Sequence, residues 1–433
     1  MAKEVKLPEK TIVPANWTWI ELGKFTETKS GYPFDSGRFS LDSDGKKPLI
    51  RIRDIVRGYT ETFTDEDCPE DYVIHRGEIL IGMDGDFNLE KWANEDALLN
   101  QRVCTIKSKS PCILDDFIYY HLPSLLKAVN EATPSVTVKH LSTKTIGKIP
   151  FPIPPLSEQH RIVDRIESLF AKLDEAKEKA QAVVDGYEQC KAAILHQAFS
   201  GEFTVLWREK HNIKLDSWRD AELNDVVSGF KYGSSEKSDY NNCGIPVFRI
   251  PNVTDDGLSF EDMKYLTHTD IPEESQIHEN DILIIRSNGS RDLVGKSVLV
   301  PKLDKEYAYA SFLIRIKPSP IINPKYLTMF LNSSDARSQM FKKAKSSAGI
   351  NNINTKELGA ISLLIPSVEE QIEIVAVIDK LLLGEQQAKE SAELVVEQIE
   401  TMKKSILARA FRGELGTNNP TDESTEELLK QTL

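Results

Sequence analysis

A long internal repeat constrains this chain more than any other feature. The segment that begins at Glu158-Gln159 returns at Glu370-Gln371, an offset of 212 residues (370 − 158 = 212). The match runs without insertion or deletion to Gly201-Glu202 in the first copy and Gly413-Glu414 in the second. Repetition at a long fixed offset sets the architecture, because each copy is one structural unit. The sequence therefore predicts a chain built from two equivalent halves.

Each copy of the repeat predicts one long amphipathic helix. Its apolar residues recur at alternating steps of four and three, which is the pattern of a left-handed coiled coil. About forty residues at ~1.5 Å each give a helix roughly 60 Å long. Because one such helix cannot bury its apolar stripe alone, we expect the two helices to pair. The alternative is that each helix packs on its own globule.

The predicted coiled-coil seam is apolar except at Glu385, where we expect a polar contact or a partner surface. Small residues in the middle of the seam would let the two helix axes come close together; these are Ala176, Ala180, Ala388 and Ala392. The larger seam residues are Ile162, Ile166, Leu169, Leu173, Val183, Tyr187, Ile194, Ile374, Ile378, Leu381, Val395, Ile399, Met402 and Ile406.

The segments that precede the two helices also echo each other. Each opens on a tryptophan, Trp17 or Trp218, contains a short buried strand after a turn, and closes with a Ser/Thr-rich loop and a strand flanked by proline. The polar tail is expected to be frayed or weakly helical. We predict an α+β fold with two mixed α/β domains and two long helices. The expected limits are 1–155 and 204–365 for the domains, 156–203 and 366–415 for the helices, and 416–433 for the tail.

Composition excludes several classes of protein. No stretch approaches the ~20 apolar residues of a membrane span, and the five scattered cysteines, without C-x-x-C spacing, indicate reduced thiols in the cytoplasm. No metal-binding spacing, nucleophile motif or dinucleotide fingerprint occurs. Gly295-Lys296-Ser297 resembles the end of a phosphate-binding loop, but the earlier glycine is replaced by Ser290. The sequence therefore predicts no catalytic residue, no metal site and no cofactor bound by this chain.

Binding features are more informative than catalytic ones. The net charge is −13, yet the acidic residues concentrate on the helices and the tail, which leaves room for basic faces on the domains. We interpret Arg51 and Arg53 as sharing one face of a strand, and basic, Ser-rich loops recur at matching places in the two halves. Lys, Arg, Ser and Asn side chains are usual contacts to nucleic-acid phosphates and base edges, although any one of them could be surface charge. The candidates are Arg51, Arg53, Arg57, Lys139, His140, Lys144, Arg249, Arg286, Arg291, Lys342, Lys343 and Lys345.

In combination these motifs resemble the specificity subunits of type I restriction-modification systems. The resemblance is carried by the Trp-x-x-x-x-Leu openings (Trp17 to Leu22, Trp218 to Leu223) and by the Ile-Leu-x-x-Ala-Phe-x-Gly-Glu ends of the helices. The proline-rich strand that leads into Glu158-Gln159 is its most specific element, although the second copy has lost most of the prolines. The resemblance covers nearly the whole chain, from about Pro14 to Leu415.

The resemblance implies a non-catalytic, cytoplasmic subunit that binds double-stranded DNA. Each domain would be a target recognition domain that reads half of a bipartite, asymmetric site, and the helices would form an antiparallel coiled coil that sets the spacing. Two methyltransferase subunits would dock on this frame, and restriction subunits would join them. S-adenosylmethionine, ATP and magnesium are expected only in those partners. The alternative of a different class is a coiled-coil scaffold that does not bind DNA, which the acidic total favours and the repeated basic loops oppose.

Overall fold

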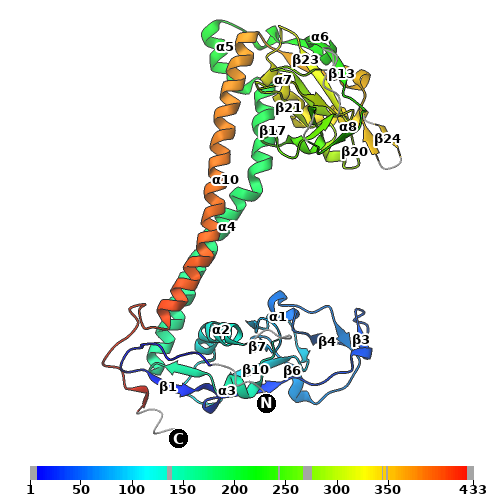
Figure 1. The fold of residues 1–433 in the computed structure, drawn as a ribbon. Helices are drawn as coiled ribbons and strands as arrows, with labels where there is room; N and C mark the ends of the chain where they lie inside the picture. Colours follow the sequence, from blue (N-terminus) through cyan, green and yellow to red (C-terminus); the bar gives the residue numbers. More distant parts are fainter. Residues whose placement is uncertain are drawn as a thin grey trace. The chain divides into compact units, whose positions relative to one another are not determined.

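The computed structural model describes residues 7–133, 139–241, 244–266, 276–343, 345–347 and 350–426 (Figure 1). The chain forms two compact units: unit 1 contains residues 1–179 and 395–433, and unit 2 contains residues 180–394. The helices α4 (Leu156–Phe199) and α10 (Val368–Ala410) each contribute to both units. The predicted domains instead separate the globules from the helices, and those limits remain a prediction.

The described residues of unit 1 form three sheets and three α-helices besides α4 and α10. Its sheets have the strand orders β1-β11, β2-β10-β7-β8 and β3-β5-β4-β9-β6. The strands are β1 (Thr18–Glu21), β2 (Thr26–Ser30), β3 (Phe39–Ser40), β4 (Lys47–Ile50), β5 (Phe63–Thr64), β6 (Val73–Ile74), β7 (Ile79–Gly82), β8 (Leu89–Lys91), β9 (Ala97–Leu99), β10 (Val103–Ser108) and β11 (Pro150–Ile153). The helices are α1 (Asp54–Arg57), α2 (Asp115–Ala132) and α3 (Thr143–Gly147).

Unit 2 repeats this arrangement with additions. Its sheets have the orders β12-β26, β13-β23-β19-β21, β14-β18-β15-β22, β16-β17 and β20-β25-β24. The strands are β12 (Arg219–Glu222), β13 (Val227–Tyr232), β14 (Ser238–Asp239), β15 (Ile245–Phe248), β16 (Val253–Thr254), β17 (Gly257–Leu258), β18 (Lys264–Leu266), β19 (Ile282–Ile285), β20 (Ser287–Asn288), β21 (Ser297–Leu299), β22 (Ala308–Tyr309), β23 (Leu313–Pro318), β24 (Lys345–Ser347), β25 (Ile350–Asn352) and β26 (Ser362–Ile365). The helices are α5 (Val205–His211), α6 (Leu223–Val226), α7 (Pro324–Leu331), α8 (Ser334–Lys343) and α9 (Thr355–Gly359).

The two motifs that bracket each domain meet in space. The opening strand pairs antiparallel with the closing strand in both units, as β1 with β11 and β12 with β26. The closing strand then leads directly into a long helix. Because Pro lacks an N–H donor, a proline-rich strand such as β11 suits a two-stranded edge position better than a sheet interior.

The Glu-Gln pair at the start of each long helix ties that helix to its domain. Glu158 and Glu370 are fully buried, and each accepts a hydrogen bond of 2.9 Å from the indole N–H of the opening tryptophan, Trp17 or Trp218. A buried carboxylate is costly unless it is hydrogen-bonded or ion-paired, so both tryptophans are fixed by this requirement.

The neighbouring glutamine makes the same contacts in both units. Gln159 accepts a hydrogen bond from the backbone N–H of Leu114 at 2.9 Å, and Gln371 accepts one from Asn323 at 2.6 Å. Their amide groups donate to the carbonyls of Pro154 and Pro366. Leu114 and Asn323 are therefore equivalent, which places the residues of α2 and α7 in register at an offset of 209 (323 − 114 = 209).

The two long helices pack together and run antiparallel, as expected. In unit 1 Asp174 of α4 pairs with Lys403 of α10. Three residues further along α4, Lys177 bonds at 2.5 Å to Glu400, which comes three residues before Lys403, so the two helices run in opposite directions. In unit 2 the Lys389 ammonium lies 4.9 Å from the ring centroid of Tyr187. The helix ends also enter the domain cores, where Ile166 belongs to the core of unit 1 and Ile378 to that of unit 2. Pairing and docking on a globule thus occur together.

Burial along the helices differs from the predicted seam at one of its two heptad positions. Several predicted seam residues are exposed, namely Ala176, Val183, Leu381, Ala388, Val395 and Met402. The next residue in each case is half-buried instead, namely Lys177, Val184, Leu382, Lys389, Val396 and Lys403. A lysine can line the seam with its aliphatic stem while its ammonium reaches solvent, so the apolar pattern alone selects the wrong neighbour. Glu385 is half-buried. Burial raises the pKa of the Tyr187 phenol, followed by the charges of Glu188, Asp256 and Asp255 and last by that of Glu385.

One further expectation is wrong, and one of the two alternatives for the tail is excluded. Arg51 and Arg53 do not share a strand face, because β4 ends at Ile50 and the chain turns into α1. The tail is not frayed over residues 417–426: the Thr417 carbonyl accepts a bond of 2.9 Å from the Arg161 guanidinium, and Thr425 is buried. The amide of Asn418 also donates to Glu158 at 2.8 Å. Residues 427–433 of the predicted tail lie outside the described part of the chain.

The first prediction concerns His121, which is buried in the core of unit 1 and stacks on Phe411 at 4.0 Å between ring centroids. Neither ring nitrogen has a hydrogen-bond partner among the described residues, and burial lowers the pKa of His121 to about 3. The unfolded chain, whose histidine has its ordinary pKa near 6.5, therefore binds a proton that the folded chain does not. The buried neutral imidazole therefore contributes fully to the free energy of unfolding above pH 6.5. That contribution is lost as the pH falls from 6.5 toward 3.

His121→Phe introduces the equivalent residue of unit 2, Phe330 (330 − 121 = 209). Below pH 6.5 the free energy of unfolding should fall less steeply in the variant, by up to about 1.4 kcal/mol per pH unit. Urea unfolding followed by tryptophan fluorescence from pH 7 to pH 5 measures the slope, with the exposed His160→Gln as control. Equal slopes in the variant and the wild type would show that His121 titrates normally.

The second prediction concerns the buried ion pair between Arg208 and Glu370, whose nearest atoms are 2.7 Å apart. Arg208→Met leaves the carboxylate of Glu370 buried without its cation, so we expect a loss of about 3–5 kcal/mol in the stability of unit 2. Adding Glu370→Gln should recover part of this loss. In unit 1 the neutral amide of Asn418 bonds the same Glu158 oxygen as the Trp17 indole, so Asn418→Ala should cost only about 1–2 kcal/mol. Thermal and urea unfolding test this order, and a larger effect for Asn418→Ala would contradict it.

Candidate nucleic-acid interface

In each unit a central strand of the main sheet continues past the sheet and makes a second pairing. After β7 the chain forms a bridge between Asp84 and His140, and after β19 the strand β20 pairs Ser287 with Asn352. His140 and Asn352 are equivalent, since they differ by 212 residues. The N–H of the next residue, Leu141 or Ile353, bonds back to the chain after the central strand at 2.7 and 2.9 Å. The predicted matching loops therefore start from the same framework position in both halves.

In unit 2 this position carries a small three-stranded sheet, β20-β25-β24, at the periphery of the unit (Figure 1). The guanidinium of Arg286 lies 4.6 Å from the ring centroid of Tyr232 and donates from Nε to the side-chain oxygen of Asn352 at 3.3 Å. Tyr232 is 39% exposed, and Asn351 and Asn352 are half-buried. Stacking and the amide contact hold the guanidinium in place, and Arg and Asn are the residues that most often read guanine and adenine edges.

More cations lie along the same part of unit 2. The guanidinium of Arg291 lies 5.1 Å from the ring centroid of Phe341 in α8. Lys342 and Lys343 end this helix and are exposed, immediately before β24. The side chain of the remaining candidate, Lys345, lies outside the described residues. The arrangement places positive charge beside the amide groups of β25, as a phosphate-contacting and base-reading surface requires.

The equivalent position in unit 1 has different chemistry. Asp84 accepts a contact of 2.7 Å from His140 and one of 3.3 Å from Arg102. Lys139 donates to the backbone and side-chain oxygens of Asn130 at 2.7 and 2.9 Å. Both candidate side chains, Lys139 and His140, are thus held by internal partners, and a carboxylate occupies the place of Ser287. Residues 134–138 of the predicted loop lie outside the described part of the chain, and Lys144 is exposed on α3.

The remaining candidates gather around a second shared turn. The N–H of Arg51 donates to the carboxylate of Asp54, and that of Arg249 to the side chain of Asn252, both at 2.8 Å. Asp54 and Asn252 are buried, so they shape the turn instead of facing a ligand. Arg249 also pairs with the carboxylate of Asp262 at 2.9 Å and has little exposure.

The first-half arginines at this turn remain more accessible. The Arg53 side chain is 49% exposed and that of Arg57 is 47% exposed, each with an acidic group at 3.8 Å. The pair of Arg57 with Glu61 lies at the surface, and weak surface ion pairs are readily exchanged for contacts with phosphate. The predicted residues therefore lie at two positions in each unit. One position is the loop at the second pairing after β7 or β19, and the other is the turn after β4 or β15.

Sequence reasoning missed three side chains at the interface: Tyr232, Asn351 and Asn352. The run Asn351-Asn352-Ile353-Asn354 carried a usable signal, because Asn side chains carry the amide donor and acceptor that pair with adenine edges. Nothing in the sequence indicated Tyr232, which comes next to Arg286 only through the pairing of β13 with β23 and of β23 with β19.

No cluster of potential metal ligands occurs among the described residues, and no helix in that part of the chain is long and apolar enough to cross a membrane. The described part of the chain thus presents polar surfaces around two strand-and-loop positions.

Known proteins share this plan. The family model described as the type I restriction modification DNA specificity domain matches twice, at residues 14–184 and 216–394. The type I restriction enzyme EcoBI specificity subunit of Escherichia coli is 31% identical over 92% of this chain and 86% of its own length. The EcoKI specificity subunit of Escherichia coli (strain K12) is 26% identical over 93% of this chain and 90% of its own.

A solved structure shows the same fold. The HsdS subunit from Thermoanaerobacter tengcongensis superposes with a TM-score of 0.62 at 18% identity, covering 93% of this chain and 98% of that one. The family model matches once in each half of the chain. This agrees with the structure, in which both units have the same pairing of opening and closing strands and each half ends in a long helix. On this evidence the chain belongs to the family of type I restriction-modification specificity subunits.

Proposed function

We propose that each of the two mixed domains reads one half of a bipartite, asymmetric site in double-stranded DNA. The observation that carries this proposal is that the pairing after β7 and the equivalent pairing after β19 carry different side chains. Asp84 and His140 stand in unit 1 where Ser287 and Asn352 stand in unit 2. One framework with two unlike sets of side chains suits two unlike half-sites, since base discrimination depends on the donors and acceptors presented.

The long helices would set the spacing between the half-sites and provide the docking frame for two methyltransferase subunits. Support comes from their lengths, 44 and 43 residues, and from the absence of any insertion between the two copies. A fixed helix length matters because DNA-reading domains must meet the duplex at a fixed helical phase. The acidic helices are unsuited to bind phosphate themselves, so affinity would come from the domains and the partner enzymes.

In this role the chain is a non-catalytic subunit that works in the cytoplasm with its partners. The methyltransferase subunits would supply S-adenosylmethionine, and restriction subunits would use ATP and magnesium. A scaffold that never touches DNA is disfavoured by the twofold match to a DNA specificity family.

The third prediction is the direct test of this function. Deleting the gene should remove one bipartite motif of methylated adenines from the host methylome, because no other subunit would direct methylation to that site. Long-read sequencing of the deletion strain and of a strain complemented with the gene measures the motif. An unchanged methylome, with the methyltransferase gene expressed, would refute the proposal.

The fourth prediction tests the reading surface of unit 2. Arg286→Ala should weaken binding to the specific duplex by about 1–3 kcal/mol, roughly 5- to 150-fold, with a smaller effect on random duplex, because a base-reading group is lost. The assembled methyltransferase complex is titrated with both duplexes by fluorescence anisotropy at fixed salt. Arg219→Ala, an exposed arginine on β12, is the matched control. Equal weakening on both duplexes would make Arg286 a phosphate contact instead.

A further inference from the structure

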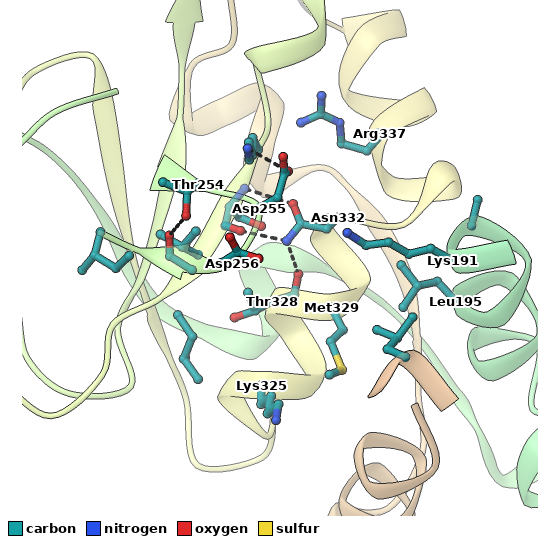
Figure 2. Close-up of a pocket in the computed structure, with 18 of the residues that line it drawn as sticks. Lys191, Leu195, Thr254, Asp255, Asp256, Lys325, Thr328, Met329, Asn332 and Arg337 are labelled. Carbon is teal, nitrogen blue, oxygen red and sulfur yellow. Dashed lines mark hydrogen bonds and ion pairs between the residues drawn. The ribbon is translucent and has the colours of Figure 1, made fainter. Parts of the chain in front are cut away.

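Unit 2 contains a cavity of about 850 Å³ beside the long helices (Figure 2). Its apolar surface includes Leu195 of α4, Met329 of α7 and Leu382 of α10. Lys191 of α4 extends along the cavity toward α7. None of the candidate nucleic-acid residues lines this space, so it is a separate feature from the loop and turn positions.

The repeat shows what occupies the same place in unit 1. At the offset of 209 between α2 and α7, Thr328 and Met329 correspond to Tyr119 and Tyr120. At the offset of 212 between the helices, Leu382 corresponds to Phe170. Three aromatic residues in one unit are therefore replaced by a threonine, a methionine and a leucine in the other. These smaller side chains occupy less of the space beside the helices than the rings of unit 1 do, and all three line the cavity.

In unit 1 the aromatic rings pack against one another. The ring centroids of Tyr119 and Tyr120 are 5.0 Å apart, and those of Tyr120 and Phe170 are 6.1 Å apart. The Tyr120 hydroxyl donates to Glu167 at 3.4 Å. The Lys403 ammonium lies 5.0 Å from the ring centroid of Phe170. The site is thus filled by aromatic rings with a lysine above them.

In unit 2 the lysine remains but the rings do not. Lys191 is the equivalent of Lys403 (403 − 191 = 212), is half-buried, and has no ion pair or ring contact among the described residues. Asp379 is the equivalent of Glu167 and lines the cavity with Lys325, its ion-pair partner at 2.6 Å. The buried hydroxyl of Ser297 also lines the cavity and has no hydrogen-bond partner in the described structure. Polar groups suited to a phenol ring are therefore present without the ring.

The rim of the cavity is acidic. Glu188, Asp255, Asp256 and Asp292 line it and are exposed or half-exposed, and Asp255 is paired with Lys296 at 2.8 Å. The Arg337 guanidinium donates to the backbone carbonyl of Asp292. Glu188 and Asp256 have no ion pair among the described residues, and their charge favours a basic group next to the occupant.

We propose that this cavity, lined by Lys191, Leu195, Met329 and Leu382, binds an aromatic side chain of a partner polypeptide, with a Lys or Arg of the same segment against the acidic rim. The ring takes the place that Tyr120 and Phe170 fill in unit 1. It gains a cation–π contact from Lys191 and a sulfur–aromatic contact from Met329. Unit 1 supplies its own rings, so the two units are unequal as partner surfaces.

This proposal rests on the proposed function only in taking the partner to be a subunit of the same assembly. The DNA motif read by the complex, measured by methylome sequencing, is independent of it. A failure of the cavity proposal and a failure of the DNA-reading proposal therefore give different results.

The fifth prediction is that p-cresol binds the full-length chain at this cavity. Saturation-transfer NMR with millimolar p-cresol should give a signal for the wild type that Met329→Tyr, which supplies the ring of unit 1, reduces at least fivefold. Lys191→Met should weaken p-cresol binding about two- to fivefold through loss of the cation–π contact. Lys404→Met, an exposed lysine of α10, is the matched control and should have no effect. An unaltered signal in Met329→Tyr, with an unchanged melting temperature, would overturn the cavity as the site.

A second arm identifies the occupant. A photoreactive p-benzoyl-phenylalanine at Ala192, which lines the cavity, is cross-linked in the assembled methyltransferase complex, and the product is digested and sequenced. A partner peptide with an aromatic residue next to Lys or Arg supports the proposal, provided that Met329→Tyr abolishes the product. Cross-linking to DNA, to a peptide without an aromatic residue, or to no partner would overturn it.

Discussion

The buried carboxylate at the start of each long helix is the constraint on which the rest of the structure depends. Glu158 and Glu370 lie where the closing strand of a domain becomes a helix, and each must be satisfied inside the protein. The opening tryptophan provides the indole N–H, which brings the first strand of the domain against the last. Strand pairing, helix direction and core packing at this junction all follow from one buried acceptor.

The two units satisfy that carboxylate differently. Glu370 has the guanidinium of Arg208, whereas Glu158 has the neutral amide of Asn418, and one oxygen of Glu158 has no partner among the described residues. Burial accordingly raises the pKa of Glu158 despite the bonds from Trp17 and Asn418. The two copies thus keep the geometry of the junction but differ in the charge of the group beside the carboxylate. In the same way, the pairings after β7 and β19 are equivalent but carry different side chains.

The sequence predicted the features that depend on local pattern, and it failed where distant contacts decide. The buried strands β7 and β19, the paired helices and the two-domain plan follow from periodicity and repetition. The choice between Val183 and Val184 in the seam does not, since a helix of 3.6 residues per turn drifts about 20° per heptad against a 3.5-residue pattern and so changes which residue faces the partner helix. Arg51 was misplaced because a buried Asp54 ends the strand, and the roles of the Glu-Gln pairs required knowledge of what lies against them.

The docking of the tail has a consequence for the order in which the protein is made. Unit 2 is continuous, but the core of unit 1 needs Phe411, and its carboxylate needs Asn418, both near the end of the chain. At roughly 5–20 residues per second, the ribosome finishes these residues on the order of 10–50 s after residue 179 has been added. During that interval unit 2 can fold while unit 1 waits. A chain cut short by premature termination would therefore carry one finished domain and one that chaperones and proteases can recognise as incomplete.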